Sequence, residues 1–255
     1  MRFVIFLTAF FILGATDRDC SITNNAFKPG EVTTYKVFYN WGLIWVEAGY
    51  ASFSCGLSTY EGKPAYHFEG RGRSYEKYDF IYKVRDYYDS YADTADLRPY
   101  RYRRDINEGG RVMFEDARFS YKKNQVYTLV KTVKEQKIDS TPITPCVVDV
   151  MTAIFYARCM DFSKCKVNDT IPFNIYLENK CYPVYVRYIG KEEKSIGKLG
   201  KMKCIKFKPL LIEGTIFKGG EDMTVWVTDD EKKIPVYVET PILVGKIKVM
   251  LAKKP

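Results

Sequence analysis

Few residues in this chain have the types and spacing that acid–base or nucleophilic chemistry needs. His67 is the one histidine among 255 residues, so it cannot belong to a histidine-rich metal site. A Ser-His-Asp nucleophile system would have to use it, and the sequence has no Gly-x-Ser-x-Gly turn to carry the serine. His67 faces the same way as Glu69 on a predicted strand, which favours a structural role. We therefore predict no catalytic residues, no metal site and no cofactor.

Paired carboxylates are the other route to catalysis, because two acids can hydrolyse a glycosidic bond. The chain has 31 acidic residues, so some of them lie close together by chance. Asp149 precedes a predicted helix and is expected to cap it, which contributes about 1 kcal/mol. The remaining acidic candidates are Asp86, Asp89, Asp93, Asp96, Asp229 and Asp230. Asp229 and Asp230 fall in a charged turn, where solvent exposure is the favoured interpretation.

Tyrosine and arginine interleave between residues 85 and 104. Aromatic faces beside guanidinium groups can bind sugar rings or anionic headgroups. Both residue types are also normal on the solvated face of a sheet, so that interpretation stays open. The candidate ligand-binding residues are Tyr87, Tyr88, Tyr91, Arg98, Tyr100, Arg101, Tyr102 and Arg103.

The seven cysteines can form disulfides if the chain is exported, and an odd number leaves at least one thiol unpaired. Cys159 and Cys165 flank a short loop, which makes them the best local pair. Cys181 and Cys204 lie on predicted strands that could be neighbours, and they are the second candidate pair. No Cys-x-x-Cys occurs, so a metal centre is not favoured.

The first residues resemble a secretory signal. Arg2 is followed by an apolar run, 3–13, and then by the small residues Gly14 and Ala15. We predict a signal peptide over 1–15, cleaved near Ala15, and a single domain over 16–255. No other segment approaches the ~20 apolar residues that a membrane-spanning helix needs, so the protein should be peripheral to a membrane at most.

The formal net charge of +9 is spread along the chain and is not gathered in one block. A basic surface of this kind is compatible with plain solubility, or with a negatively charged partner such as anionic lipid headgroups or an acidic glycan. Nucleic acid is disfavoured, because no recognisable binding motif accompanies the charge.

Residues that alternate between apolar and polar dominate the mature chain, and this is the period of a strand. The stretch from Met223 to Leu251 reads as three strands in a meander, and 31–39, 43–55, 65–74 and 84–92 continue the pattern. The turn 107–110 separates two strands in a hairpin, and 136–145 reads as a loop. Helical spacing occurs only near 75–82 and, more strongly, at 148–158. We predict a mainly β fold: a large, strongly curved antiparallel sheet that forms a β-sandwich or an open barrel, with one central helix.

Several motifs, taken in order, resemble the DUF3108 family of exported bacterial proteins over about residues 27–252. They are PGE at 29–31, YKVFY at 35–39, VEAG at 46–49, YKVRDYY at 82–88, DLRP at 96–99, WVTDD at 226–230, IPV at 234–236 and VGKI at 244–247. The resemblance implies a periplasmic, β-rich protein of a kind common in Bacteroidetes, without an assigned activity. Its architecture would be similar to that of small envelope lipoproteins linked to capsule export. The resemblance supplies no catalytic residues.

The leading functional hypothesis is a non-enzymatic envelope protein that binds a lipid, a glycan or a partner protein on a curved sheet. One alternative is a carboxylate-dependent hydrolase of envelope polysaccharide or lipid, which requires two acids that face one cleft. The other is a structural subunit of an envelope assembly, which requires an exposed apolar patch.

Overall fold

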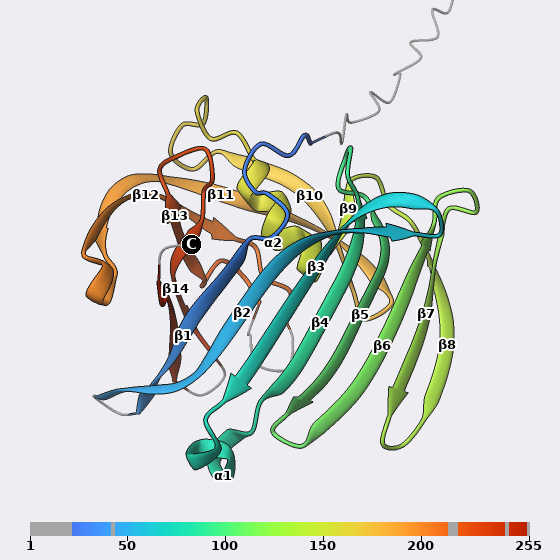
Figure 1. The fold of residues 1–255 in the computed structure, drawn as a ribbon, viewed down its shortest axis with the longest axis horizontal. Helices are drawn as coiled ribbons and strands as arrows, with labels where there is room; N and C mark the ends of the chain where they lie inside the picture. Colours follow the sequence, from blue (N-terminus) through green and yellow to red (C-terminus); the bar gives the residue numbers. More distant parts are fainter. Residues whose placement is uncertain (1–21, 42–43, 214–218, 243–244, 254–255) are drawn as a thin grey trace, which may run out of the picture.

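The computed structural model describes residues 22–41, 44–213, 219–242 and 245–253 (Figure 1). The predicted signal peptide, its cleavage site near Ala15 and Cys20 lie outside these residues. Among the described helices, none is long and apolar enough to cross a bilayer.

Strands make up most of the described chain, as the alternating pattern predicted. The strands are β1 (Val32–Trp41), β2 (Ile44–Tyr60), β3 (Lys63–Ser74), β4 (Arg85–Asp93), β5 (Pro99–Glu108), β6 (Arg111–Ser120), β7 (Gln125–Thr132), β8 (Gln136–Pro142), β9 (Val147–Asp149), β10 (Thr170–Leu177), β11 (Lys180–Ser195), β12 (Lys201–Pro209), β13 (Thr224–Thr228), β14 (Pro235–Pro241) and β15 (Lys246–Leu251). The helical elements are η1 (Glu76–Tyr78), α1 (Asp79–Tyr82), α2 (Val150–Cys159) and η2 (Gly197–Leu199).

All of these strands join one sheet in the order β8-β7-β6-β5-β4-β3-β2-β1-β15-β14-β13-β12-β11-β10-β9. Neighbours pair antiparallel except β9 and β10, which are parallel, so the sheet is mixed. Most links are tight hairpins. Between β5 and β6, Gly109 and Gly110 adopt φ values of +58° and +93°, a conformation that glycine reaches at little cost. The first and last strands pair at the centre of the sheet, and the middle of the chain supplies its two edges.

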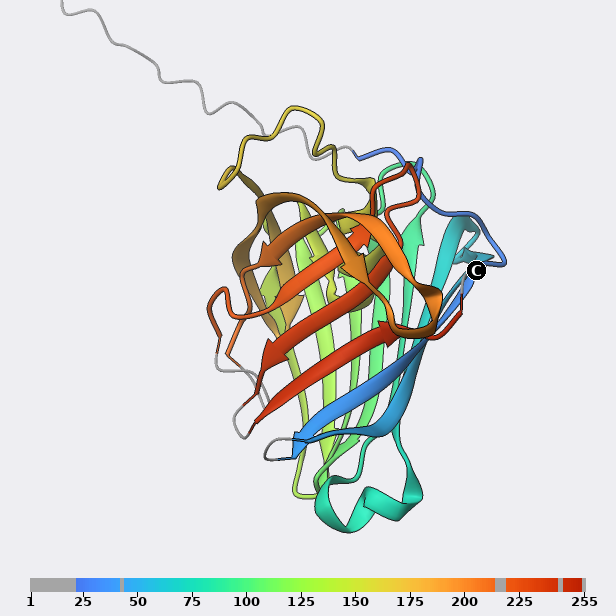
Figure 2. The ribbon, with the colours of Figure 1, turned by 90° about the vertical axis from the view of Figure 1, so that its left-hand side faces the viewer.

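The sheet rolls up until its two edges overlap (Figures 1 and 2). β9 approaches β5, and β8 approaches β11. Side chains bond across the overlap: the Tyr176 hydroxyl on β10 donates to Glu115 on β6 over 3.0 Å, and it lies 2.6 Å from the Thr128 hydroxyl on β7. The roll is not closed by a continuous ladder. Of the two predicted forms, it is the open, barrel-like one.

Helix α2 fills one half of the interior of the roll, between β3, β4, β9 and β10. Its Phe155 ring stacks on Phe68 of β3 at a centroid distance of 4.1 Å, and both side chains are buried. Asp149 caps the helix as predicted, since its Oδ1 accepts from the backbone N–H groups of Met151 and Thr152 at 2.8 and 2.9 Å. The helix therefore stands at a fixed depth inside the sheet.

Two boundaries differ from the predictions. The predicted loop 136–145 contains the edge strand β8. Its last residue, Pro142, has no backbone N–H to donate, which an edge strand tolerates. The predicted helix 148–158 begins later, at Val150, because residues 147–149 pair with β10 as β9. The helical turn predicted near 75–82 is confirmed as η1 and α1.

Both predicted disulfides are wrong. Cys159, Cys165, Cys181 and Cys204 are free thiols, as is Cys55, whereas Cys146 is disulfide-bonded. Cys204 pairs in register with Glu192 of β11. Cys181 lies on the same strand eleven residues before Glu192, which is on the order of 35 Å at the usual rise of a strand. Cys181 is therefore far from Cys204.

The sulfurs of the other predicted pair have different partners. Cys159 donates to Asn24 Oδ1 over 3.7 Å, and Cys165 donates to the Asp161 carbonyl over 3.7 Å. Proximity in sequence therefore does not bring these two thiols together.

Candidate functional site

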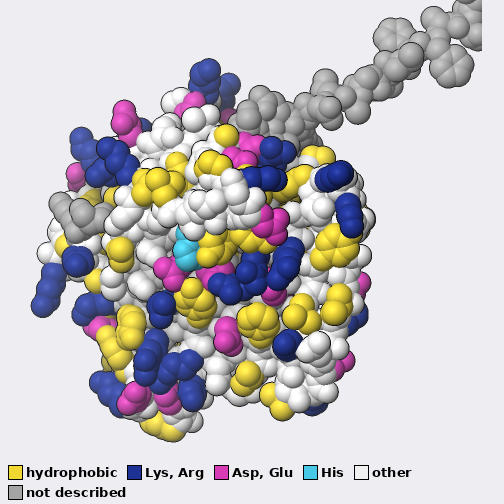
Figure 3. Space-filling view, turned by 45° about the vertical axis from the view of Figure 1, so that its right-hand side comes forward, with side chains coloured by type: hydrophobic (Ala, Val, Ile, Leu, Met, Phe, Trp, Pro, Cys, Tyr) yellow, Lys and Arg dark blue, Asp and Glu magenta, His cyan; other side chains and the backbone are white. Residues whose placement is uncertain are grey.

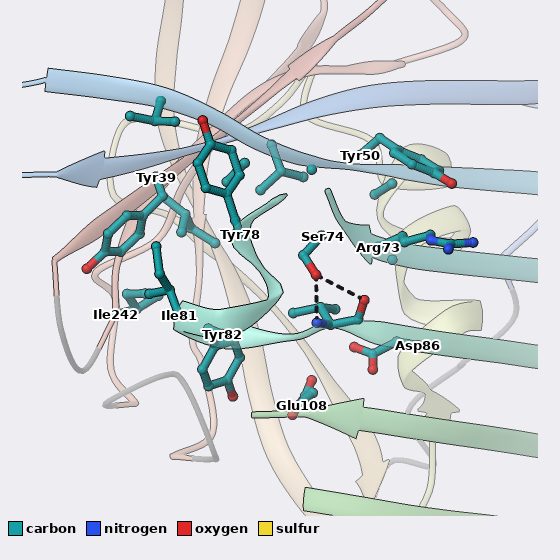
Figure 4. A pocket seen from close by; sticks show the side chains of 18 of the residues that line it. Tyr39, Tyr50, Arg73, Ser74, Tyr78, Ile81, Tyr82, Asp86, Glu108 and Ile242 are labelled. Carbon is teal, nitrogen blue, oxygen red and sulfur yellow. Dashed lines mark hydrogen bonds between the residues drawn. The ribbon is translucent and has the colours of Figure 1, made fainter. Parts of the chain in front are cut away.

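A cavity of about 840 Å³ lies at the end of the roll opposite α2, beside α1. Its walls are the inner faces of β1, β2, β3 and β15, together with the segment 78–84 (Figure 4). Aliphatic side chains dominate these walls, among them Val37, Val46, Ala51 and Ile247. The volume and the apolar lining are those of a small-molecule binding site.

The segment containing η1 and α1 covers one side of this cavity. Phe80, Ile81 and Tyr82 line the cavity, although Phe80 is 84% exposed to solvent. The adjacent Ile81 and Tyr82 are exposed as well, which makes the whole turn apolar on its outer side. It places apolar surface at the entrance of the apolar cavity.

Hydrogen bonds anchor this segment to the end of β3. The Ser74 hydroxyl donates to Asp79 Oδ1 over 2.5 Å. It also accepts from the Val84 N–H over 2.9 Å (Figure 4). Arg85 forms an ion pair with Asp79 at 2.6 Å. The hydrogen bond from Ser74, with a smaller contribution from Arg85, lowers the pKa of Asp79.

Two acids, Asp86 of β4 and Glu108 of β5, face the cavity side by side (Figure 4). Asp86 Oδ1 accepts from the Asn107 N–H over 3.1 Å. Burial, and then the nearby charge of Glu108, raise the pKa of Asp86 to about 7. Asp86 is therefore partly protonated near neutral pH.

The predicted ligand-binding residues do not form one site, because successive residues on a strand point to opposite faces. The inner face is fixed by Gly70 of β3, where an added Cβ would lie 2.7 Å from Met151 of α2. By register with β3, the side chains of Tyr88 and Tyr102 are on this inner face. Those on the outer face are Tyr87, Tyr91, Arg101 and Arg103.

The outer arginines are already engaged by acids. Arg101 donates to both oxygens of Asp116 at 2.8 and 2.6 Å, and Arg103 forms a bidentate pair with the fully buried Asp89. The Tyr87 hydroxyl donates to Glu69 over 2.8 Å. Figure 3 shows this mixture of acidic and basic side chains around the histidine. These groups stabilise the wall of the sheet.

The other candidates are also engaged within the protein. Arg98 forms an ion pair with Asp96 at 2.6 Å, and the Tyr100 hydroxyl donates to Asp93 over 2.5 Å. The ring of His67 stacks on Tyr91 at 4.4 Å. No group of three or more potential metal ligands occurs among the described residues.

Sequence reasoning identified Asp86 only as one of several acids and assigned Glu108 to a turn. The sequence does place both acids on the inner face. Asp86 is two residues from the inward-facing Tyr88, and Glu108 is an even number of residues from Tyr102 and Ile106. An acid at an inward position of a strand is a candidate site residue. The cavity that these two acids face depends on how the sheet curls.

None of the curated proteins matches this chain. Among solved structures, it is similar to the crystal structure of a β-barrel-like protein of domain of unknown function DUF1849 from Brucella abortus. The TM-score is 0.54 at 8% sequence identity, over 87% of this chain and 95% of that one. This similarity shows a shared fold. The model of the family "Protein of unknown function (DUF3108)" matches residues 34–252, as the ordered motifs suggested, and the chain therefore belongs to the DUF3108 family.

Proposed function

We propose that this protein is a non-enzymatic, exported envelope protein that binds a lipid-like amphiphile in the cavity beside α1. The observation that carries the proposal is the cavity itself, about 840 Å³ in volume and walled by aliphatic and aromatic side chains. Burial of an alkyl chain against such walls is favourable by ~0.8 kcal/mol for each methylene. Of the three ligand classes considered from the sequence, these walls favour a lipid over a glycan.

The cavity has a covered side through which a chain could pass. Phe80 is exposed while its neighbours line the interior, and η1 and α1 together are seven residues long. The segment is anchored chiefly at Asp79, by Ser74 and Arg85, so displacing it breaks fewer bonds than opening the sheet. In this proposal the segment moves to admit the chain and then covers it.

The test is native mass spectrometry of the protein purified from its own envelope fraction, with extraction of any bound lipid. Gly72→Leu places a side chain in the cavity from β3, where an added Cβ has no neighbour closer than 3.8 Å. Gly56→Leu is the matched control, because Gly56 pairs with His67 on the outer face.

The expected result is a co-purifying amphiphile on the wild type and on Gly56→Leu, and none on Gly72→Leu. Wild-type protein that carries no lipid and binds none from envelope extracts would refute the proposal. Equal loading of both variants would place the ligand elsewhere.

A second candidate function is hydrolysis, which the Asp86–Glu108 pair favours because two acids face one cavity. The two acids stand side by side on the cavity wall, and the charge of Glu108 acts on Asp86. Two neighbouring acids of this kind resemble the acid pair of aspartic proteases, which activates water. The discriminating assay follows envelope lipids and peptides over time with the wild type and with Asp86→Asn. Turnover that only the wild type shows would establish this function.

A further inference from the structure

Buried acids in the described part of this protein have compensating partners. The buried carboxylates of Glu115, Asp89 and Asp116 form ion pairs with Arg104, Arg103 and Arg101, respectively. Asp149 is compensated by the N-terminus of α2 and by the Ser90 hydroxyl. Compensation is expected, because an unpaired charge in an apolar setting costs several kcal/mol.

The half-buried acids Asp86 and Glu108 face the cavity without such partners. Within the described ranges, neither carboxyl forms an ion pair with a lysine or an arginine. The cation whose charge acts on Asp86 is Arg104, which is already bonded to Glu115 and Glu178. Arg73 also lines the cavity, but its guanidinium pairs with Glu76 at 3.1 Å, so the two carboxyl groups have no cation of their own on a mostly apolar wall.

Aromatic rings stand beside this charge. Tyr39, Tyr78 and Tyr82 line the same cavity, and Tyr82 lies next to Glu108 (Figure 4). The Tyr82 ring also packs against the hairpin after Glu108, since a Cβ on Gly109 would lie 2.4 Å from it. Carboxylates together with aromatic faces are the groups that proteins use to hold ammonium ions.

We infer that the amphiphile carries a protonated amine, and that this ammonium group binds at Asp86 and Glu108 while the alkyl chain lies along the aliphatic wall. The inference rests on the proposed lipid-binding function and adds the chemical class of the ligand's polar end. The ammonium ion would supply at this pair the positive charge that the protein itself provides for its buried acids.

The experiment compares three ligands of equal chain length, namely decylamine, 1-decanol and decanoate. Each is titrated into the full-length protein at pH 7.5, below its micelle-forming concentration, by isothermal titration calorimetry. The test variant is the double substitution Asp86→Asn and Glu108→Gln, which keeps shape and removes charge. The control is Asp105→Asn, which removes one exposed acid from β5.

For the wild type and Asp105→Asn, the expected result is decylamine affinity at least ~10-fold above that of 1-decanol, and weaker binding of decanoate. In the double variant the amine preference should fall to about one while 1-decanol affinity is unchanged. Equal affinity of wild type for amine and alcohol, or a preference for decanoate, would overturn the headgroup assignment and leave the lipid-binding cavity standing. If none of the three binds, both proposals fail together.

Discussion

Replacing Arg104 with methionine tests whether the overlap between the sheet's edges holds the roll together. Arg104 is buried on β5, where it donates to Glu115 over 2.6 Å and to Glu178, next to the end of β10, over 3.0 Å. Glu115 is fully buried and also accepts a hydrogen bond from the Tyr176 hydroxyl. Methionine retains much of the side chain's volume and leaves the Glu115 carboxylate without its cation.

The expected loss of unfolding free energy is about 3–5 kcal/mol, the usual effect of breaking a buried ion pair by removing one partner. This is a large share of the ~5–15 kcal/mol that stabilises a typical domain. Arg111→Met is the matched control, because Arg111 contacts the same Glu178 at 3.0 Å but has 39% of its side chain exposed. Exposed ion pairs contribute at most about 1 kcal/mol.

Urea unfolding followed by tryptophan fluorescence measures both effects as shifts in midpoint at constant m-value. Adding Glu115→Gln to Arg104→Met should restore part of the stability, because it neutralises the unpaired carboxylate. Similar losses in the two arginine variants, or no rescue by the glutamine, would show that the buried network is not what secures the overlap.

Three further results are expected. The raised pKa of Asp86, about 7 against an ordinary 3.8, means that the folded state binds a proton more tightly than the unfolded chain. Wild-type stability should therefore fall as pH rises from about 4 to about 7, and a series of thermal melts should show a shallower fall for Asp86→Asn. Gly70→Ala should cost about 1–3 kcal/mol by chemical denaturation, because its new methyl group would press on Met151 in the filled half of the interior. Iodoacetamide followed by peptide mass spectrometry should modify the partly exposed Cys165 and Cys181 in the native protein, whereas the buried thiols should react only after unfolding; native protection of both would contradict the placement of these two residues.

Local features of the fold could be predicted from the sequence, and distant ones could not. The hairpin around Gly109 and Gly110 and the cap at Asp149 depend on residues within a few positions of each other, and both are found. Pairing between β1 and β15 joins Val37 to Val249. No periodicity within either strand specifies that partner. Strand β8 escaped prediction because an exposed edge strand needs little apolar alternation, and its pattern is mostly polar.

The candidate site shows the same limit. Interleaved tyrosine and arginine indicated an interaction surface, but alternation along β4 and β5 divides six of the eight residues between two faces. Asp86 and Glu108 are brought together by strand register, and the cavity that they face remains because α2 fills only the other half of the roll. Alternation along a strand predicts which face of the sheet a side chain occupies. The position of a cavity depends on how all the elements pack together.

The central position of β1 and β15 has a consequence for biosynthesis. A ribosome makes β1 first and β15 last, so each half of the protein can form its own ladder of hairpins long before the halves can join. A chain released before residue 246 would expose the backbone groups of both β1 and β14 along their full length, and such open ladders recruit other chains. Truncated products of this protein should therefore aggregate, while a cut in the connection between β8 and β9 should leave two fragments able to reassemble.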